Sequence, residues 1–269
     1  VLWYSIYDDD GKSIWEERFP EKRIQDIKTE FESVGNLNGF YQEYMNEAQS
    51  PDDAPFKPQY IKLHHYIFKY LDGDSVLIGK SGGKDIKKPV NVYCGIDPAS
   101  SLSRRADFFV IATLALDADG NIYILDILRD KVDPAYQPEK IIEIYKKFRP
   151  KRMTIETVGY QEALRANVRK MMLEQNLYIP GLEKGIKPRQ RKSERLLSLV
   201  APLAKGEFFF RPEDIHAQQE FLSYPRGKHD DILDAIYYAL DKAKPSRQKQ
   251  YINIEDRKNK SKVLDWMTL

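Results

Sequence analysis

Cysteine is almost absent from this sequence, and long apolar runs are absent altogether. Cys94 is the single cysteine among 269 residues, so an internal disulfide is impossible, and such sparse usage is typical of a reducing compartment. No apolar run approaches the length of a membrane span, and the first residues lack the basic-then-apolar pattern of a secretion signal. We therefore expect no membrane association, a cytoplasmic location, and burial of Cys94 in a strand.

Excess charge of one sign is also lacking. The 43 Lys and Arg residues nearly balance the 41 Asp and Glu residues, which gives a formal net charge of +2. The basic residues gather instead in three places, at 104–105, over 184–195 and over 242–262. Such clusters are compatible with a nucleic-acid surface, but alone they also indicate an ordinary solvated face.

A phosphate-binding loop is missing as well. Gly79, Gly82 and Gly83 lie beside Lys80 and Lys84. The pattern, however, requires Gly-Lys-Ser/Thr four residues after a first glycine, with a strand before it and a helix after it, and this segment offers neither. We therefore expect no ATP site in this chain.

Composition divides the chain into four parts. Residues 50–58 hold three prolines and two adjacent acids, which is typical of a linker, and the tail after residue 244 has few large apolar residues. We expect an N-terminal appendage over residues 1–60, a connector over 61–88, a main domain over 89–243 and a flexible basic tail over 244–269.

Two predicted strands end in carboxylates. Asp97 closes an apolar run over residues 90–96, and Pro98 prevents that run from continuing as a central strand. Glu156 closes a second run over residues 152–155. An Asp at a strand end is often only a turn former, so a functional interpretation of Asp97 requires partners from elsewhere in the chain.

The order of elements predicts an α/β fold with a mixed five-stranded sheet flanked by helices. Strands over 90–97, 108–116 and 122–128 form an antiparallel meander, because residues 117–121 have hairpin-turn chemistry. A helix over 137–148 connects it to the strand over 152–156. Helices over 161–175, 193–204 and 213–222 and a short strand over 207–210 follow. The first and fourth strands are expected to be parallel neighbours, so that Asp97 and Glu156 face each other.

A predicted helix over residues 229–240 begins with further acids. At about 100° per residue, Asp231 and Asp234 share one stripe, while apolar residues line another face. Carboxylates in the first turn of a helix are favourable by themselves, so Asp230 and Asp231 are also explained as plain caps.

Together these acids would form a cluster in which like charges destabilise one another. Mg²⁺ and Mn²⁺ relieve such repulsion because they prefer oxygen ligands, and two ions about 4 Å apart can flank a phosphodiester. One ion would lower the pKa of a water that attacks, and the other would neutralise the leaving 3′ oxygen. The hypothesis fails if the carboxylates lie far apart or if a lysine ammonium fills the gap between them.

Several stretches carry a family resemblance. Residues 95–99, 155–161 and 228–235, with a weaker match over 184–206, resemble the C-terminal nuclease domain of the large terminase subunit of tailed phages, an RNase H-like fold related to Holliday-junction resolvases. Residues 15–20 and 40–46 resemble the end of that family's ATPase domain, which makes residues 1–60 a remnant of it.

The resemblance implies a metal-dependent endonuclease that cuts concatemeric double-stranded DNA at the start and end of genome packaging. Asp97, Glu156 and Asp231 would be the catalytic metal ligands, with Asp234 assisting and Asp230 third, because Asp231-x-x-Asp234-Ala235 is similar to the resolvase pattern. It implies one or two Mg²⁺ or Mn²⁺ ions, the cytoplasm of the host cell, and as partners the portal protein, the small terminase subunit and the ATPase domain of the full-length protein. Because no phosphate loop is present, we interpret the chain as a fragment.

Basic and aromatic residues have two interpretations each. The candidate DNA contacts are Arg104, Arg105, Lys184, Lys187, Arg189, Arg191, Lys192 and Arg195, which otherwise serve only solubility. His229 is either a residue of the helix cap or a partner of a metal ligand. The aromatic runs at 208–210 and 237–238 are expected to be core or half-buried contacts rather than platforms for base stacking.

Two other functions are compatible with the sequence. One is a resolvase or transposase-type nuclease of the same fold, which would prefer branched or specific DNA. The other is a motor segment that docks on DNA or on the portal without cleaving, which the basic tail and the missing ATPase motif favour.

Overall fold

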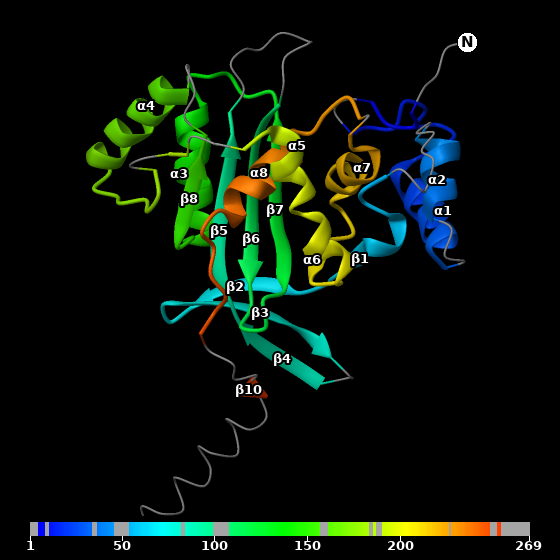
Figure 1. The fold of residues 1–269 in the computed structure, drawn as a ribbon, viewed down its shortest axis with the longest axis horizontal. Helices are drawn as coiled ribbons and strands as arrows, with labels where there is room; N and C mark the ends of the chain where they lie inside the picture. The colour runs from blue at the N-terminus through cyan, green and yellow to red at the C-terminus, as the bar shows by residue number, and fades with distance from the viewer. Residues whose placement is uncertain are drawn as a thin grey trace, which may run out of the picture.

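A six-stranded mixed sheet with helices on both faces forms the body of the molecule in the computed structural model (Figure 1). The structure describes residues 5–8, 11–33, 37–45, 54–81, 84–98, 108–156, 161–182, 185–186, 190–225, 227–247 and 252–253. In sheet order the strands are β1 (Lys62–Leu63), β9 (Phe208–Phe210), β7 (Ile122–Asp130), β6 (Phe109–Leu116), β5 (Asn91–Asp97) and β8 (Arg152–Ile155).

The predicted meander and crossover are both confirmed. β5 pairs with β6 and β6 with β7 in antiparallel fashion, whereas β5 and β8 are parallel. The five predicted strands are all present, and β1 extends the sheet by pairing with β9 in parallel. The fold is therefore the expected mixed α/β class, with one strand more than the sequence indicated.

β6 is buried on both faces, which explains its unbroken apolar run. Phe109 and Ile111 belong to the core that contains α3 (Gln137–Phe148) and α4 (Gln161–Glu174). Val110 and Leu114 belong to the opposite core, under four further helices. Those helices are α5 (Lys192–Leu197), α6 (Val200–Ala204), α7 (Ile215–Ser223) and α8 (Asp231–Leu240).

The helix expected over residues 193–204 is divided into α5 and α6. Pro202 has no N–H to donate into a continuous helix, but it is tolerated in the first turn of a new one. A turn at Ser198 and Leu199 therefore separates the two helices.

A second sheet occupies much of the segment for which we expected only a connector. β2 (Ile67–Leu71), β3 (Asp74–Ser81) and β4 (Lys84–Pro89) form an antiparallel sheet that β10 (Ile252–Asn253) completes at the β4 edge. Buried Lys88 connects it to the body, because its Nζ lies 2.8 Å from Asp117 Oδ2 in the turn between β6 and β7. Lysines and aspartates interspersed among the apolar residues of this segment obscured its strands in the sequence.

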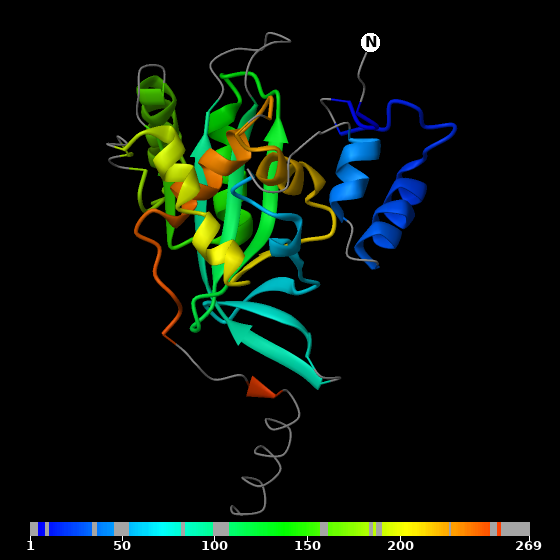
Figure 2. The same cartoon turned by 45° about the vertical axis from the view of Figure 1, so that its right-hand side comes forward.

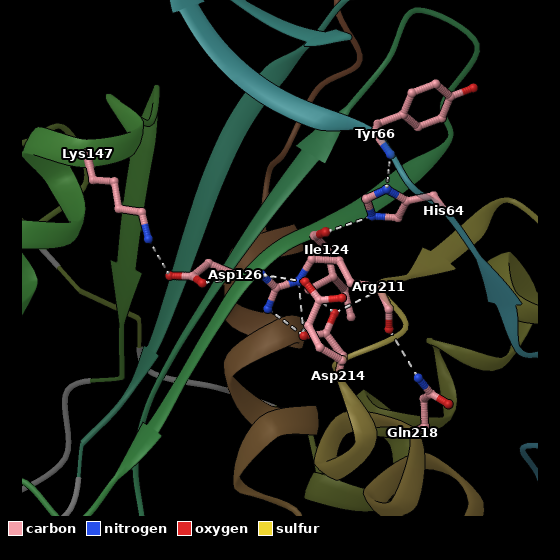
Figure 3. A network of polar contacts seen from close by, with 9 residues as sticks. His64, Tyr66, Ile124, Asp126, Lys147, Arg211, Asp214 and Gln218 are labelled. Atoms are coloured by element: carbon pink, nitrogen blue, oxygen red, sulfur yellow. Dashed lines mark hydrogen bonds and ion pairs between the residues drawn. The ribbon is translucent and has the colours of Figure 1, made fainter. Parts of the chain in front are cut away.

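Two N-terminal helices, α1 (Glu21–Ser33) and α2 (Leu37–Tyr44), lie on the α7 side of the body, away from α3 and α4 (Figure 2). Their apolar core includes Leu222 of α7. The buried Lys28 Nζ donates to Gln218 Oε1 at 2.5 Å, and Gln218 Nε2 donates to the carbonyl oxygen of Arg211 at 3.2 Å. Figure 3 shows that Arg211 in turn contacts Asp214 and Asp126, so polar contacts run from α1 to the central sheet. None of the helices in the described ranges is long and apolar enough to cross a bilayer.

Candidate functional site

The two predicted strand-end carboxylates emerge at the same end of the sheet. The parallel register of β5 and β8 pairs Ile96 with Ile155, and Asp97 and Glu156 are the next residues on the two strands. Glu156 also forms an isolated parallel bridge with Ile186. The crossover through α3 thus brings together acids that are far apart in the sequence, as expected.

α8 lies directly on β5, and this packing places Asp231 and Asp234 at the same edge of the sheet. A side chain at Gly95 would collide with the α8 backbone at Ala235 and Ala239, so only glycine permits the approach. Asp231 and Asp234 are buried. The Asp230 side chain makes no capping hydrogen bond, which argues against the simple cap interpretation of this residue.

The N-terminus of α8 is held instead by residues that sequence reasoning missed. The Ile232 N–H donates to buried Glu220 Oε2 at 2.8 Å, and the Phe108 N–H donates to Asp231 Oδ2 at 3.4 Å. Arg129 places its guanidinium 3.4 Å from the centroid of the Phe108 ring and its Nε 3.6 Å from Glu220 Oε1. No motif marks Glu220 or Arg129, because each is defined only by its tertiary contacts.

His229 lies beside the same acid. Its Nδ1 is 3.7 Å from Asp231 Oδ2, and its ring packs edge-on against Phe108 with centroids 5.2 Å apart. His229 thus contacts Asp231, and its role as a partner of a metal ligand stays a prediction.

The carboxylates act on one another electrostatically. The pKa of Asp97 is raised well above its ordinary value, first by burial and then by the charges of Asp234, Asp231 and Glu156. Burial also raises the pKa of Asp234, against the opposing effect of Lys192. Asp97, Glu156, Asp231 and Asp234 are therefore close enough to influence one another electrostatically, and their role as a metal-binding cluster stays a prediction.

A lysine ammonium lies on the helix side of this cluster. Lys192 Nζ is 2.7 Å from Asp230 Oδ1 and 2.7 Å from Asp234 Oδ2. Among the residues with described positions, no three acidic, His or Cys side chains are arranged to hold an ion as they stand. A lysine ammonium between the carboxylates would count against a metal site. Here Lys192 forms ion pairs with two of the five candidate ligands, Asp230 and Asp234.

The donor set nevertheless suits a hard divalent cation. All five candidate ligands are carboxylates, which is the ligand type that Mg²⁺ and Mn²⁺ prefer. Asp234 Oδ1 is buried and accepts no hydrogen bond from the described part of the chain. By the chemistry of their side chains Asp97, Glu156 and Asp231 stay the predicted ligand set, although their present arrangement does not yet hold an ion, and Lys192 occupies Asp234.

Few of the predicted DNA contacts can be placed. Five of them, namely Arg104, Arg105, Lys184, Lys187 and Arg189, lie outside the described residues. Arg191 is exposed at the start of α5. Arg195 is buried and donates from Nη1 to Tyr238 Oη at 2.9 Å, a geometry that favours a structural role over a DNA contact.

The cysteine and the aromatic runs are buried or half-buried. Cys94, Phe208 and Phe210 have no exposed surface and Tyr238 is 1% exposed, while Phe209 and Tyr237 are half-buried. Burial raises the pKa of the Cys94 thiol to about 12, so the cysteine is not a nucleophile at neutral pH.

The sheet order, the crossover and the acids at its edge define an RNase H-like nuclease fold. Residues 94–243, more than half of the chain, match the family described as the terminase RNaseH-like domain. The chain belongs to this family of terminase domains with an RNase H-like fold.

Solved structures of phage terminase nucleases are similar to it at low sequence identity. The large terminase nuclease from thermophilic phage G20c with bound magnesium is 16% identical, with a TM-score of 0.47 over 71% of this chain and 98% of that one. The same nuclease with bound zinc is 17% identical, with a TM-score of 0.46 over 69% and 96%. The nuclease domain from Thermus phage P74-26 is 15% identical, with a TM-score of 0.43 over 67% and 90%. No curated protein matches the sequence.

Proposed function

We propose that the chain is a divalent-metal-dependent DNA endonuclease that cuts concatemeric double-stranded DNA for a viral packaging motor. The observation that carries this proposal is that Asp97 and Glu156 follow paired positions of two parallel strands, and that α8 lies on β5 with Asp231 and Asp234, whose charges help to raise the pKa of Asp97. Such repulsion has no structural use, and it is relieved when a cation binds.

Asp97, Glu156 and Asp231 would hold the cation, Mg²⁺ or Mn²⁺, as one or two ions. When bound, it supplies Lewis-acid activation of a water and stabilises negative charge on the leaving 3′ oxygen. His229 and the Phe108 N–H orient Asp231 toward the site. Asp234 would join the ligands when its ion pair with Lys192 opens, with Asp230 third.

The chain's own cations would bind DNA through its phosphates. Arg191 and Lys192 occupy the start of α5 next to the acids, and Arg104, Arg105, Lys184, Lys187 and Arg189 remain proposed contacts. Contacts of this kind carry no base information, so cleavage should show little sequence preference and weaken steeply with salt. We propose three partners within the packaging motor: the portal protein, the small terminase subunit and the ATPase domain of the full-length protein. The proposed location is the cytoplasm of the host cell.

Plasmid cleavage tests the proposal. The protein is incubated with supercoiled plasmid and Mn²⁺, with and without EDTA, and compared with Asp97→Ala and with the exposed control Glu143→Ala. We expect cleavage by the parent and the control only, and only without EDTA. Plasmid that stays supercoiled, or equal cutting by Asp97→Ala, would count against a nuclease.

One observation favours a second candidate, a module that docks on DNA or the portal without cutting. The ion pairs of Lys192 with Asp230 and Asp234 already neutralise part of the cluster. Tight binding of duplex DNA without metal-dependent cutting, under conditions where the fold is intact, would support this function instead.

A further inference from the structure

Two cations approach Asp234 from α5, and they are held very differently. Arg195 Nη2 lies 3.7 Å from Asp234 Oδ1, but Arg195 is also anchored by its hydrogen bond to Tyr238 and lies over the rings of Tyr237 and Tyr238. Its side chain is only 8% exposed. Arg195 is therefore a fixed part of the interior.

The Lys192 side chain is far more exposed than that of Arg195 and is therefore less firmly held beside Asp234. Its side chain is 47% exposed, whereas the Asp234 side chain that it contacts is 6% exposed. The ammonium reaches down from the surface to a buried carboxylate and at the same time contacts Asp230. The exposed lysine stem can rotate, but its release leaves the buried Asp234 carboxylate with less compensation, so the cost lies between the about 0–1 kcal/mol of an exposed ion pair and the about 3–5 kcal/mol of a broken buried pair. An entering divalent cation would supply the missing compensation.

Moving the ammonium would uncover a strongly charged site. The pKa of Asp97 is raised first by burial and then by the charges of Asp234, Asp231 and Glu156, and the charge of Lys192 opposes this rise. Without the ammonium, Asp234 Oδ2 would be open to an entering ion, while Arg195 Nη2 would stay 3.7 Å from Oδ1. The same ammonium, once released, lies at the edge where a phosphodiester must approach the acids.

We propose that Lys192 is an exchangeable internal counter-ion, which holds Asp230 and Asp234 in the metal-free enzyme and passes to a DNA phosphate when a divalent cation enters. This inference rests on the proposed function and adds its regulation. Because the ammonium leaves the acids for the phosphate, duplex and cation should bind cooperatively, and by linkage each should raise the affinity of the other by the same factor.

Metal binding without turnover tests the exchange. The Mn²⁺ dissociation constant of the full chain is measured by calorimetry for the parent, Lys192→Met, Lys192→Gln and the exposed control Lys205→Met, with thermal melts to check folding. Since the ion no longer displaces an ammonium, both Lys192 variants should bind Mn²⁺ about fivefold to tenfold more tightly, and the control should not change. Unchanged affinity in folded Lys192 variants would overturn the inference.

The coupling is measured with a phosphorothioate duplex, which resists cleavage. In the parent we expect the duplex to tighten Mn²⁺ binding, and in Lys192→Met we expect most of this gain to be lost. Equal coupling in the two proteins would show that Lys192 is not transferred to the phosphate. If the parent binds no Mn²⁺ at all, the proposed nuclease function fails; if it binds Mn²⁺ with unaltered affinity in the variants, only the exchange fails.

Discussion

Asp97→Asn should stabilise the metal-free protein while it abolishes cleavage. Asp97 is the acid whose pKa is raised well above its ordinary value by burial and by three neighbouring carboxylates. A carboxyl group with a raised folded pKa binds its proton more tightly in the native state, so its ionisation costs stability as the pH rises above the ordinary value of 3.8. The isosteric amide removes this cost.

The size of the gain follows from the free energy of a pKa shift. One unit corresponds to about 1.4 kcal/mol, and because the residue is partly accessible we expect a gain on the order of 1–2 kcal/mol at pH 7. In a chain of this size, each 1 kcal/mol raises Tm by about 2–4 °C. The gain should shrink as the pH falls toward the ordinary pKa of 3.8 and vanish below it, where the group is protonated in both the native and the unfolded parent.

Thermal melts in EDTA and in Mn²⁺ provide the assay. At about 100 times its Kd, a bound ion stabilises the parent by about 2.7 kcal/mol, and Asp97→Asn should lose most of this increment. The variant should therefore melt above the parent in EDTA and below it in saturating Mn²⁺. A variant that melts below the parent in EDTA at pH 7 would refute the account of repulsion.

Three further changes test the supports of the site. Gly95→Ala should destabilise the protein by about 3 kcal/mol or more, as seen in urea unfolding, because the new methyl group collides with the α8 backbone. Glu220→Gln should keep the acceptor for the α8 N-terminus and retain cleavage, whereas Glu220→Ala should lose both stability and Mn²⁺ affinity; equal behaviour of the two variants would contradict this role. Burial lowers the pKa of Lys28 from 10.5 to about 8, so the unfolded chain binds more protons between these values and stability should rise with pH across that window. Lys28→Met should flatten this rise in pH-dependent melts.

The strand-end acids were predictable because their signals are local. Pro98 ends the strand directly after Asp97, and a right-handed crossover through one amphipathic helix fixes β8 beside β5. The helix acids followed from periodicity. Each of these inferences requires only the order of the predicted strands and helices along the chain and the known geometry of the backbone.

What escaped prediction depends on contacts between distant segments. Lys192 belongs to a basic cluster that we predicted to contact DNA. Its contact with Asp234 arises only because α5 packs beside α8. No sequence motif marks Glu220 or Arg129. In the sequence alone, the two members of a buried ion pair cannot be distinguished from ordinary charged surface residues. The strands over residues 67–89 were hidden by interspersed lysines and aspartates.

The most direct test of the central claim is a crystal of the protein soaked with Mn²⁺ and measured for anomalous scattering. We expect an anomalous-scattering peak for Mn²⁺ among the carboxylates of Asp97, Glu156 and Asp231, with the Lys192 side chain turned away from Asp234. Absence of a peak at saturating Mn²⁺, with the Lys192 ammonium still bound to Asp230 and Asp234, would contradict it.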